Sequence, residues 1–367
     1  MLFINKLKKF KKIYLIIITS VLFLNTFLIS EIQAVSFKIP EIEISEDFDL
    51  NFNKRKVFDK AFKVAFDQLT LMITTSSYKK RLNQTNIENI KSLIDSFNIS
   101  DEKFINNKYY AKFNVNFNKR KTLKFFEKNN IFPSIPKKID VLFIPVLINS
   151  QSGKLIMFSE NPIFINWNKN LKASDLINYI PPNEDIEDRI FLEANLKTIE
   201  DYNFEEIIKK YSIEDFIINI IYQKENNLKV LSKIKLNDNY KVINTNYQNI
   251  DLENEKSRKN FIYKLKDIYE DDWKVLNIIN TSIKLSVTMS LLSRDIDKIK
   301  LFESLMNNLD LVSDFYILSF NNKKIYYKII YNGTPKKLLA VFKNSGFEVK
   351  RDDKNWNIKW PTLINYF

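Results

Sequence analysis

Residues 139–149 read IDVLFIPVLIN, and this stretch decides the class of fold. Every residue from 141 to 148 is apolar, over a length typical of a strand. A strand that is apolar on both faces must be buried on both faces, as in an α/β layer. We therefore predict a central sheet with helices on its two faces, and GKLIMFS at 153–159 as a strand that pairs with the first.

The same pattern continues downstream and defines a central α/β unit over residues 136–277. Three further strands are predicted at DFIINIIYQ (215–223), LKVLSKIKL (228–236) and NYKVINTNY (239–247). A helix over 203–211 precedes them, and a long amphipathic helix over 252–276 follows. Strands with interspersed helices indicate an α/β architecture.

Upstream, residues 35–135 predict a small N-terminal α/β unit, which opens with a short strand, EIEIS. Apolar side chains recur at three- and four-residue steps from Phe58 to Met72, which predicts a helix beginning near Asn53. A second helix is predicted over 86–97. YYAKFNVNFN at 109–118 alternates between apolar and polar residues, as a half-buried strand does, and leads into a helix over 119–129.

Downstream, residues 278–367 predict a ferredoxin-like C-terminal unit. SIKLSVTMSL (282–291) is a strand, followed by a helix over 295–307 and by strands at 314–320 and 323–331. A helix over 335–343 and a strand at 347–350 complete the order βαββαβ, and a further final strand is predicted at 355–360. The predicted class is thus α/β and α+β, in three units.

Residues 1–34 have the composition of a secretory signal. Five lysines precede an apolar run over 13–29, and a short segment ending at Ala34 follows. This order is typical of a leader that is cleaved on export. We predict cleavage after Ala34 and a periplasmic protein; the alternative is a retained anchor in the inner membrane, facing the periplasm. No other contact with a membrane is predicted.

The formal net charge of +13 does not by itself predict a nucleic-acid partner. The charge is carried mainly by Lys, in a chain also crowded with Asn, Ile and Phe, which is the codon usage of an AT-rich genome. The predicted export also separates the chain from nucleic acid. We therefore predict no nucleic-acid partner.

The chain has no His and no Cys, which excludes several chemistries. Ser–His–Asp and Cys–His catalysis, His or thiolate metal sites and disulfides are all ruled out. Three glycines cannot build a glycine-rich phosphate loop. We predict no cofactor.

One nucleophile arrangement is left, a Ser–Lys pair. Ser76 with Lys79, and Ser232 with Lys235, match the spacing S-x-x-K. Such matches arise by chance in a Lys-rich chain, and Ser232 lies within a predicted strand, where no helical turn brings the pair together. We predict no catalytic residue and no enzyme activity.

Acidic and aromatic clusters offer further candidates. Carboxylates at 184–188 or at 270–272 suit a hard cation or a general acid and base; a solvated surface is the favoured interpretation. The acidic residues are Glu184, Asp185, Glu187, Asp188, Glu270, Asp271 and Asp272. Tyr326, Tyr327 and Tyr331 on one strand could form a stacking platform for RNA, although alternation along the strand places them on two faces.

The hexapeptide NFNKRK occurs twice, at 51–56 and 116–121. In both copies an extended segment gives way to a helix, and Asn53 and Asn118 are suited to cap its first turn. The favoured interpretation is a solvated junction. The alternative is an anion site, in which a helix N-terminus is joined by basic side chains. Its residues would be Lys54, Arg55, Lys119 and Arg120.

A resemblance rests on several longer patterns. They are YYAKFNVNFN (109–118), VLFIPVLIN (141–149), ENPIFINW (160–167), IDKIKLFESL (296–305) and FYILSFNNKKIYYKIIYNGTPKKLLAVFKNSGFEV (315–349). In these the chain resembles domain of unknown function 2066, a family of exported proteins of Gram-negative bacteria. The first unit also resembles small α/β domains of periplasmic assembly proteins, such as the flagellar protein that builds a periplasmic ring. The resemblance implies export and no catalytic residue.

We accordingly expect a non-enzymatic interaction or assembly protein of the cell envelope, with an envelope protein as its partner. One alternative is a periplasmic binding protein for an anionic ligand, through the two basic junctions. A second is a hydrolase with a carboxylate or Ser–Lys centre. A deep pocket lined by these residues would favour the alternatives, whereas an exposed apolar surface would favour the interaction protein.

Overall fold

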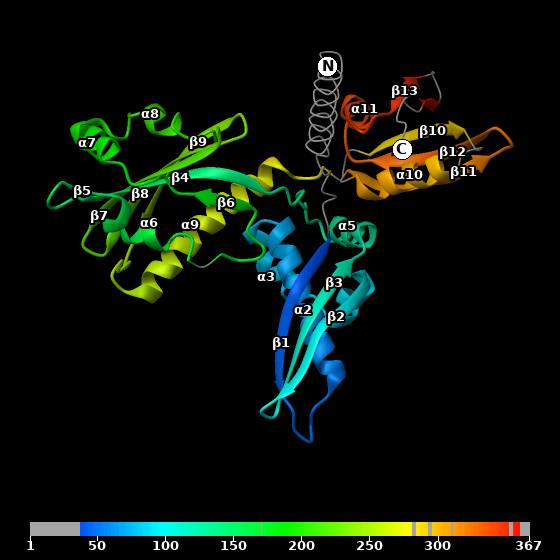
Figure 1. Ribbon diagram of the computed structural model, residues 1–367, viewed down its shortest axis with the longest axis horizontal. Helices are drawn as coiled ribbons and strands as arrows, with labels where there is room; N and C mark the ends of the chain where they lie inside the picture. Colours follow the sequence, from blue (N-terminus) through cyan, green and yellow to red (C-terminus); the bar gives the residue numbers. More distant parts are fainter. Residues whose placement is uncertain are drawn as a thin grey trace, which may run out of the picture. The chain divides into compact units, whose positions relative to one another are not determined.

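The computed structural model describes residues 37–169, 171–280, 284–292, 296–309, 311–351 and 355–359. Three sheets interleaved with helices confirm the predicted mixed α/β class (Figure 1). The predicted signal segment, residues 1–34, lies outside the described residues. Within those ranges, no helix has the length and apolar character needed to cross a membrane.

The first sheet is antiparallel, in the order β1-β3-β2. Its central strand β3 (Lys108–Phe117) buries alternate side chains, as predicted. The helix α2 (Lys54–Ile73) buries Ala61, Ala65 and Phe66 in the same core. The small alanines let the helix lie close to the sheet. Around this core lie β1 (Lys38–Asp47), η1 (Ser76–Tyr78), α3 (Lys79–Leu82) and α5 (Lys119–Lys128).

The predicted helix over 86–97 is wrong in its second half. Helix α4 ends after one short stretch (Ile87–Leu93), and the chain continues as strand β2 (Ile94–Ile105). This strand forms a hairpin with β3, whose two turn residues Asn106 and Asn107 have φ of 49° and 57°. Two successive left-handed residues match the right-handed twist of a hairpin. Cross-strand pairing therefore overrides the local helical pattern.

The central sheet confirms the prediction made from residues 139–149. Strand β4 (Ile139–Asn149) pairs in parallel with β7 and β6, and antiparallel with β5. The order is β5-β4-β7-β8-β9, with β6 also beside β4. The remaining strands are β5 (Lys154–Ile156), β6 (Ile177–Ile180), β7 (Phe216–Lys224), β8 (Asn227–Leu236) and β9 (Asn239–Tyr247).

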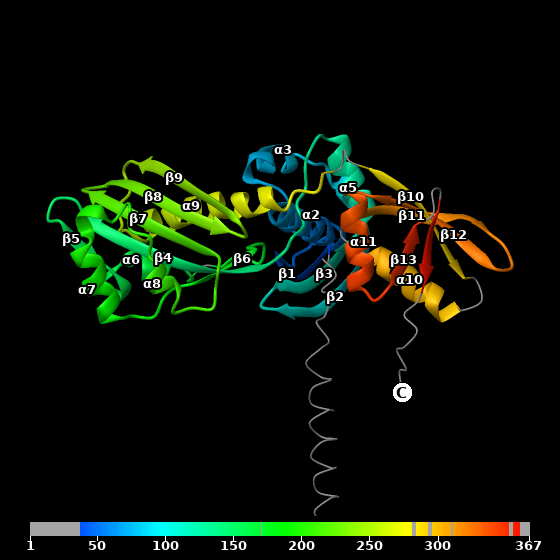
Figure 2. The same ribbon diagram turned by 90° about the horizontal axis from the view of Figure 1, so that it is seen from above.

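Helices cover both faces of this sheet, and β4 is buried on both. Val141 and Phe143 pack with α9 (Glu255–Leu276), while Leu142 and Ile144 pack on the opposite face. Figure 2 shows α9 on one side of the sheet and α7 and α8 on the other. The other helical segments here are η2 (Phe158–Glu160), α6 (Pro162–Asn166), α7 (Ile186–Ala194), η3 (Leu196–Thr198) and α8 (Glu205–Ile208).

The third sheet has the predicted order of elements but differs from the simplest ferredoxin-like arrangement. Its order is β11-β12-β10-β14-β13. The strand after the second helix, β13, lies at the edge, and β14 returns to pair in parallel with β10. The elements are β10 (Leu285–Leu292), α10 (Ile296–Asn308), β11 (Val312–Phe320), β12 (Lys324–Tyr331), α11 (Pro335–Asn344), β13 (Glu348–Arg351) and β14 (Trp356–Lys359).

Candidate functional site

Strand β11 forms one edge of the C-terminal sheet and carries an exposed apolar segment. It pairs with β12 on one side only, in the described part of the chain. In Figure 1 it borders the sheet next to β12. The side chains that give this edge its apolar character are Tyr316 (49% exposed), Ile317 (50%), Leu318 (55%) and Phe320 (79%). We call residues 316–320 the β11 edge.

The beginning of β11 is covered, in contrast to its end. Asp314 forms an ion pair with Arg120 of α5, and the distance from Asp314 Oδ1 to Arg120 Nη1 is 3.2 Å. The same guanidinium lies 4.7 Å from the ring centroid of Phe315. The open part of the strand therefore starts at Tyr316.

The hairpin that follows the β11 edge is basic. The Asn321 side chain accepts hydrogen bonds from the amides of Lys323 and Lys324, which fixes the turn. Lys324 Nζ donates to Asn357 at 3.0 Å. Lys323 is exposed and forms no ion pair with any described carboxylate. The apolar edge thus ends beside a free positive charge.

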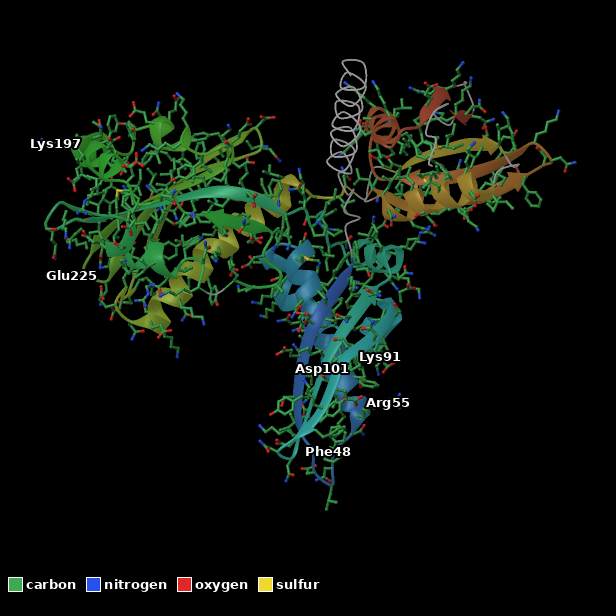
Figure 3. The ribbon with its side chains drawn as sticks, in the orientation of Figure 1. Phe48, Arg55, Lys91, Asp101, Lys197 and Glu225 are labelled. Carbon is green, nitrogen blue, oxygen red and sulfur yellow. The ribbon has the colours of Figure 1, made fainter. Side chains whose placement is uncertain are left out.

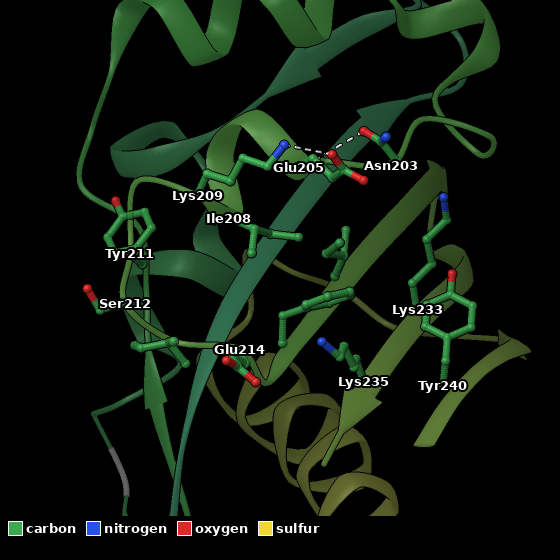
Figure 4. Close-up of a pocket in the computed structure, with 13 residues that line it drawn as sticks. Asn203, Glu205, Ile208, Lys209, Tyr211, Ser212, Glu214, Lys233, Lys235 and Tyr240 are labelled. Carbon is green, nitrogen blue, oxygen red and sulfur yellow. Dashed lines mark hydrogen bonds and ion pairs between the residues drawn. The ribbon is translucent and has the colours of Figure 1, made fainter. Parts of the chain in front are cut away.

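A cleft of about 770 Å³ opens beside α8, on the face of the central sheet opposite to α9 (Figure 4). Its floor consists of Phe216 and Ile218 from β7. Lys233 and Lys235 from β8 and Tyr240 from β9 extend along one side. The opposite wall comes from α8 and the segment after it, 211–214. We call this the α8 cleft.

Lys233 is the unusual group of this cleft, because it is only 7% exposed. Its Nζ donates to the backbone oxygen of Tyr202 at 2.8 Å and lies 5.8 Å from the ring centroid of Phe204. No carboxylate among the described residues forms an ion pair with it. Burial lowers the pKa of Lys233 because the charged form loses hydration.

A second cluster of charge is buried along α9. Lys266, Glu270 and Lys274 follow each other at four-residue steps and are all buried. Glu270 accepts hydrogen bonds from the amides of Leu176 and Ile177 at 2.9–3.1 Å. Burial nevertheless raises the pKa of Glu270 to about 7. Lys274 borders a pocket of about 130 Å³ together with Glu270 and Asp271.

The acidic run Glu270-Asp271-Asp272 was expected on a solvated surface, and this prediction is wrong for Glu270, which is buried, whereas Asp271 and Asp272 are half-buried. Glu270 accepts the hydrogen bonds from the loop before β6 given above. Asp271 accepts hydrogen bonds from the amide and hydroxyl of Ser76 at 2.8 and 2.5 Å. Asp272 forms an ion pair with Lys241 of β9. Three successive carboxylates thus fasten α9 to three different segments.

The structure places the two copies of NFNKRK at helix starts, as predicted. The Asn53 side chain accepts a hydrogen bond from the amide of Arg55, and Asn118 accepts one from Lys121. Lys54 is ion-paired with Glu102 at 2.6 Å. Arg55 extends from the first turn of α2 into solvent (Figure 3).

The two basic junctions are not brought together. Lys119 Nζ donates to the backbone oxygen of Leu309 at 2.7 Å, and Arg120 is paired with Asp314. Glu102, which is ion-paired with Lys54, lies opposite Ala111 of β3, whereas Lys119 lies two residues beyond the end of that strand. At ~3.3 Å per residue the junctions lie roughly 20 Å apart.

Neither Ser–Lys pair forms the hydrogen bond that a nucleophile would need. Ser232 and Lys235 lie on opposite faces of β8, because the Ser232 hydroxyl contacts Tyr269 of α9 and Lys235 lines the α8 cleft. Ser76 and Lys79 line the same small pocket, but the Ser76 hydroxyl donates to Asp271.

The acidic residues at 184–188 serve the start of α7. Asp185 caps the helix through the amide of Glu187, and Lys210 bridges Asp185 and Asp188 at 2.5 and 2.7 Å. Glu184 accepts from the amide of Ser159. The nearby Lys210 ammonium, together with the hydrogen bond that Asp185 accepts from the amide of Glu187, holds the pKa of Asp185 below its usual range. No group of three or more acidic side chains suited to a metal occurs within the described residues.

The three tyrosines of β12 serve two faces of the sheet, as predicted. Tyr327 and Tyr331 are buried in the core, and the Tyr327 hydroxyl donates to Glu303 at 2.6 Å. Tyr326 lies at the alternate position on the other face. No stacking platform results from these three side chains.

The sequence indicated the β11 edge only in part, and it missed the α8 cleft. DFYILSF was predicted as a strand, but its edge position depends on the order of strands. The cleft is assembled from segments between residues 203 and 240, with no motif of their own. No protein-family model matches the chain, and no curated protein is significantly similar to it in sequence.

Proposed function

We propose that this chain is a non-enzymatic interaction or assembly protein of the cell envelope, and that a partner protein adds an extended segment to the β11 edge. The observation that carries the proposal is the row of half-exposed apolar side chains on an edge strand, Tyr316, Ile317, Leu318 and Phe320. Export to the periplasm and kinship with the exported family above belong to the same proposal.

The chemistry of an edge strand favours this use. Its outer N–H and C=O groups pair with no strand of the described part of the chain, so they can receive a further strand. Strand addition gains affinity from main-chain hydrogen bonds and specificity from alternate side chains. The five residues 316–320 span roughly 17 Å at ~3.3 Å each, the length of an ordinary short strand.

The partner segment that fits this edge is extended, apolar at alternate positions, and acidic at one end. Alternate apolar side chains would cover the exposed ones of β11, and the acidic end would pair with Lys323 beside the turn. Natural proteins protect exposed apolar edges with charges or proline. Between residues 316 and 320 this chain has neither.

The experiment is crosslinking of a tagged copy in cells, followed by mass spectrometry of the captured proteins. We expect one reproducible envelope protein with the unaltered chain and its loss with the double substitution Leu318→Lys and Phe320→Lys. The matched control is Ile186→Lys, which adds a charge at another exposed apolar residue, outside the C-terminal unit.

Equal capture with the edge variant would reject the β11 edge as the docking surface. Self-capture of the tagged chain through the same residues would replace the foreign partner by a second copy. Measurement of the unfolding midpoint of each variant separates loss of docking from loss of folding, because exposed positions change stability little.

A further inference from the structure

We infer that the α8 cleft is a binding site for a small amphipathic anion, with one acidic head and an apolar body. Neither the β11 edge nor the basic junctions contribute to it. The inference rests on an unpaired ammonium group at the wall, an apolar floor, and a volume suited to such a ligand.

The unpaired ammonium group is that of Lys233. Lysine is almost never fully buried unless it is paired, because a buried charge without a partner loses its hydration. Lys233 is 93% removed from solvent, and its one hydrogen bond goes to a neutral backbone oxygen. The Nζ has donors to spare. Asp201 and Glu200 act on it from a distance but form no ion pair with it, so an acidic ligand in the cleft would supply a direct counter-charge.

Lys235 adds a second free cation on the same side. It lies two residues along β8, so its side chain extends from the same face as Lys233. It forms no ion pair with a described carboxylate. The third lysine of the lining, Lys209, is neutralised by Glu205 at 2.8 Å.

Glu214 is the one carboxylate of the lining that has no ion-pair partner among the residues that the structure describes. It is exposed, so solvent and salt weaken its repulsion of an anion. The free charges of the lining therefore sum to positive, two lysines against one glutamate. Figure 4 shows Glu214 at the end of the cleft near Lys235, away from Lys233.

The remaining lining selects the body of the ligand. Phe216 and Ile218 form an apolar floor, and Ile208 and Ile213 extend it up the opposite wall. Tyr240 is exposed and offers both a ring and a hydroxyl. Pockets of about 300–1,000 Å³ accept small molecules of drug size. An aliphatic or aromatic carboxylate or sulfonate meets all of these requirements.

The test measures binding of decanoate to the full chain by calorimetry, with decanol as the uncharged probe of equal length. We expect saturable binding of decanoate and at least tenfold weaker binding of decanol. Lys235→Met should weaken decanoate binding about tenfold, as loss of a charged hydrogen bond does. Glu214→Gln should strengthen it.

The matched control is Lys229→Met, on the same strand and face but outside the cleft. It should leave decanoate binding unchanged. Lys233→Met is the second variant, with its unfolding midpoint measured beside the affinity, because a change at a buried site can alter the fold. Equal binding of decanol and decanoate, or affinities unaffected by Lys235→Met, would overturn the inference.

A parallel experiment shows whether the acidic head of the ligand belongs to a membrane lipid or to a soluble molecule. Sedimentation with phosphatidylglycerol vesicles, compared with phosphatidylcholine vesicles, tests for a lipid surface. Vesicle binding that is lost in Lys235→Met, without binding of free decanoate, would assign the head to a membrane lipid. Binding of decanoate alone would assign it to a soluble ligand. Absence of both would overturn the inference.

Discussion

At the scale of single residues, the polar groups buried along α9 join the parts of the central unit. Tyr269 donates to Asn219 at 2.7 Å and contacts the Ser232 hydroxyl at 2.8 Å, between helix and sheet. Lys266 Nζ lies 5.2 Å from the ring centroid of Tyr179 and 5.5 Å from that of Trp167, and it forms no hydrogen bond with any described residue. Such groups contribute to stability only while their partners stay in place.

Replacement of Tyr269 tests this dependence. Tyr269→Phe leaves Asn219 and Ser232 without their shared partner, so we expect the free energy of unfolding to fall by about 1–3 kcal/mol. Urea unfolding followed by circular dichroism measures it. The control is Tyr263→Phe on the same helix, which carries no described hydroxyl hydrogen bond and should change stability little. Equal losses in both variants would contradict the account.

Glu270 gives a prediction for pH. Its pKa is raised by burial from 4.5 to about 7, so the folded chain retains a proton that the unfolded chain has lost. The stability from this group is fully present below pH 4.5 and is lost as the pH rises to about 7. Relative to Glu270→Gln, the native chain should lose up to about 3 kcal/mol across that interval.

Chemical unfolding of both chains at a series of pH values measures this difference. Lys274, Asp175 and Lys266 are charged groups that act on Glu270, and they are present in both chains. A difference that stays constant from pH 4.5 to 7, or that grows in favour of the native chain, would show that folding does not raise the pKa of Glu270.

Sequence patterns predicted buried elements well and edge elements poorly. The continuous apolar run of β4 and the alternation of β3 admit one interpretation each, because burial requires apolar side chains. Strand β2 was missed because its exposed residues carry no alternation, and its register comes from pairing with β3. The position of β14 beside β10 likewise depends on pairing, which local sequence does not encode.

The candidate sites show the same division. The alternating Lys residues of β8 predict a face that is exposed to solvent. Segments from residue 202 onward nevertheless bury Lys233. The doubled hexapeptide predicted two helix starts correctly, because a cap depends on nearby residues. Its predicted anion site needed a long-range contact between Lys54 and Lys119 that the strand length of β3 prevents.

The helix caps allow a test at the scale of elements. Asn118→Ala removes the side-chain acceptor for the amide of Lys121, so we expect α5 to be destabilised by about 1 kcal/mol. Asn118→Asp retains the acceptor and should retain the stability. Thermal unfolding of the native chain and the two variants measures this difference in stability. Identical unfolding midpoints for all three would mean that the Asn118 cap does not stabilise the fold.

For the whole molecule, composition leads to a prediction about metal and redox state. The chain lacks His and Cys, and within the described residues no acidic group of three or more is arranged for a metal. Stability must then come from packed cores and the contacts described above. We expect the unfolding midpoint to be the same with and without EDTA, and with and without a thiol reductant. A lower midpoint in EDTA would reveal a structural metal.

The proposed role of the whole molecule is to bind a partner protein at the β11 edge. The most direct measurement places a photo-crosslinking amino acid at Leu318 and, as control, at Ile186, in cells, and identifies the adducts. The account predicts one envelope protein crosslinked from Leu318 and absent from Ile186, through an apolar segment with an acidic end. The absence of any adduct specific to Leu318 would contradict it.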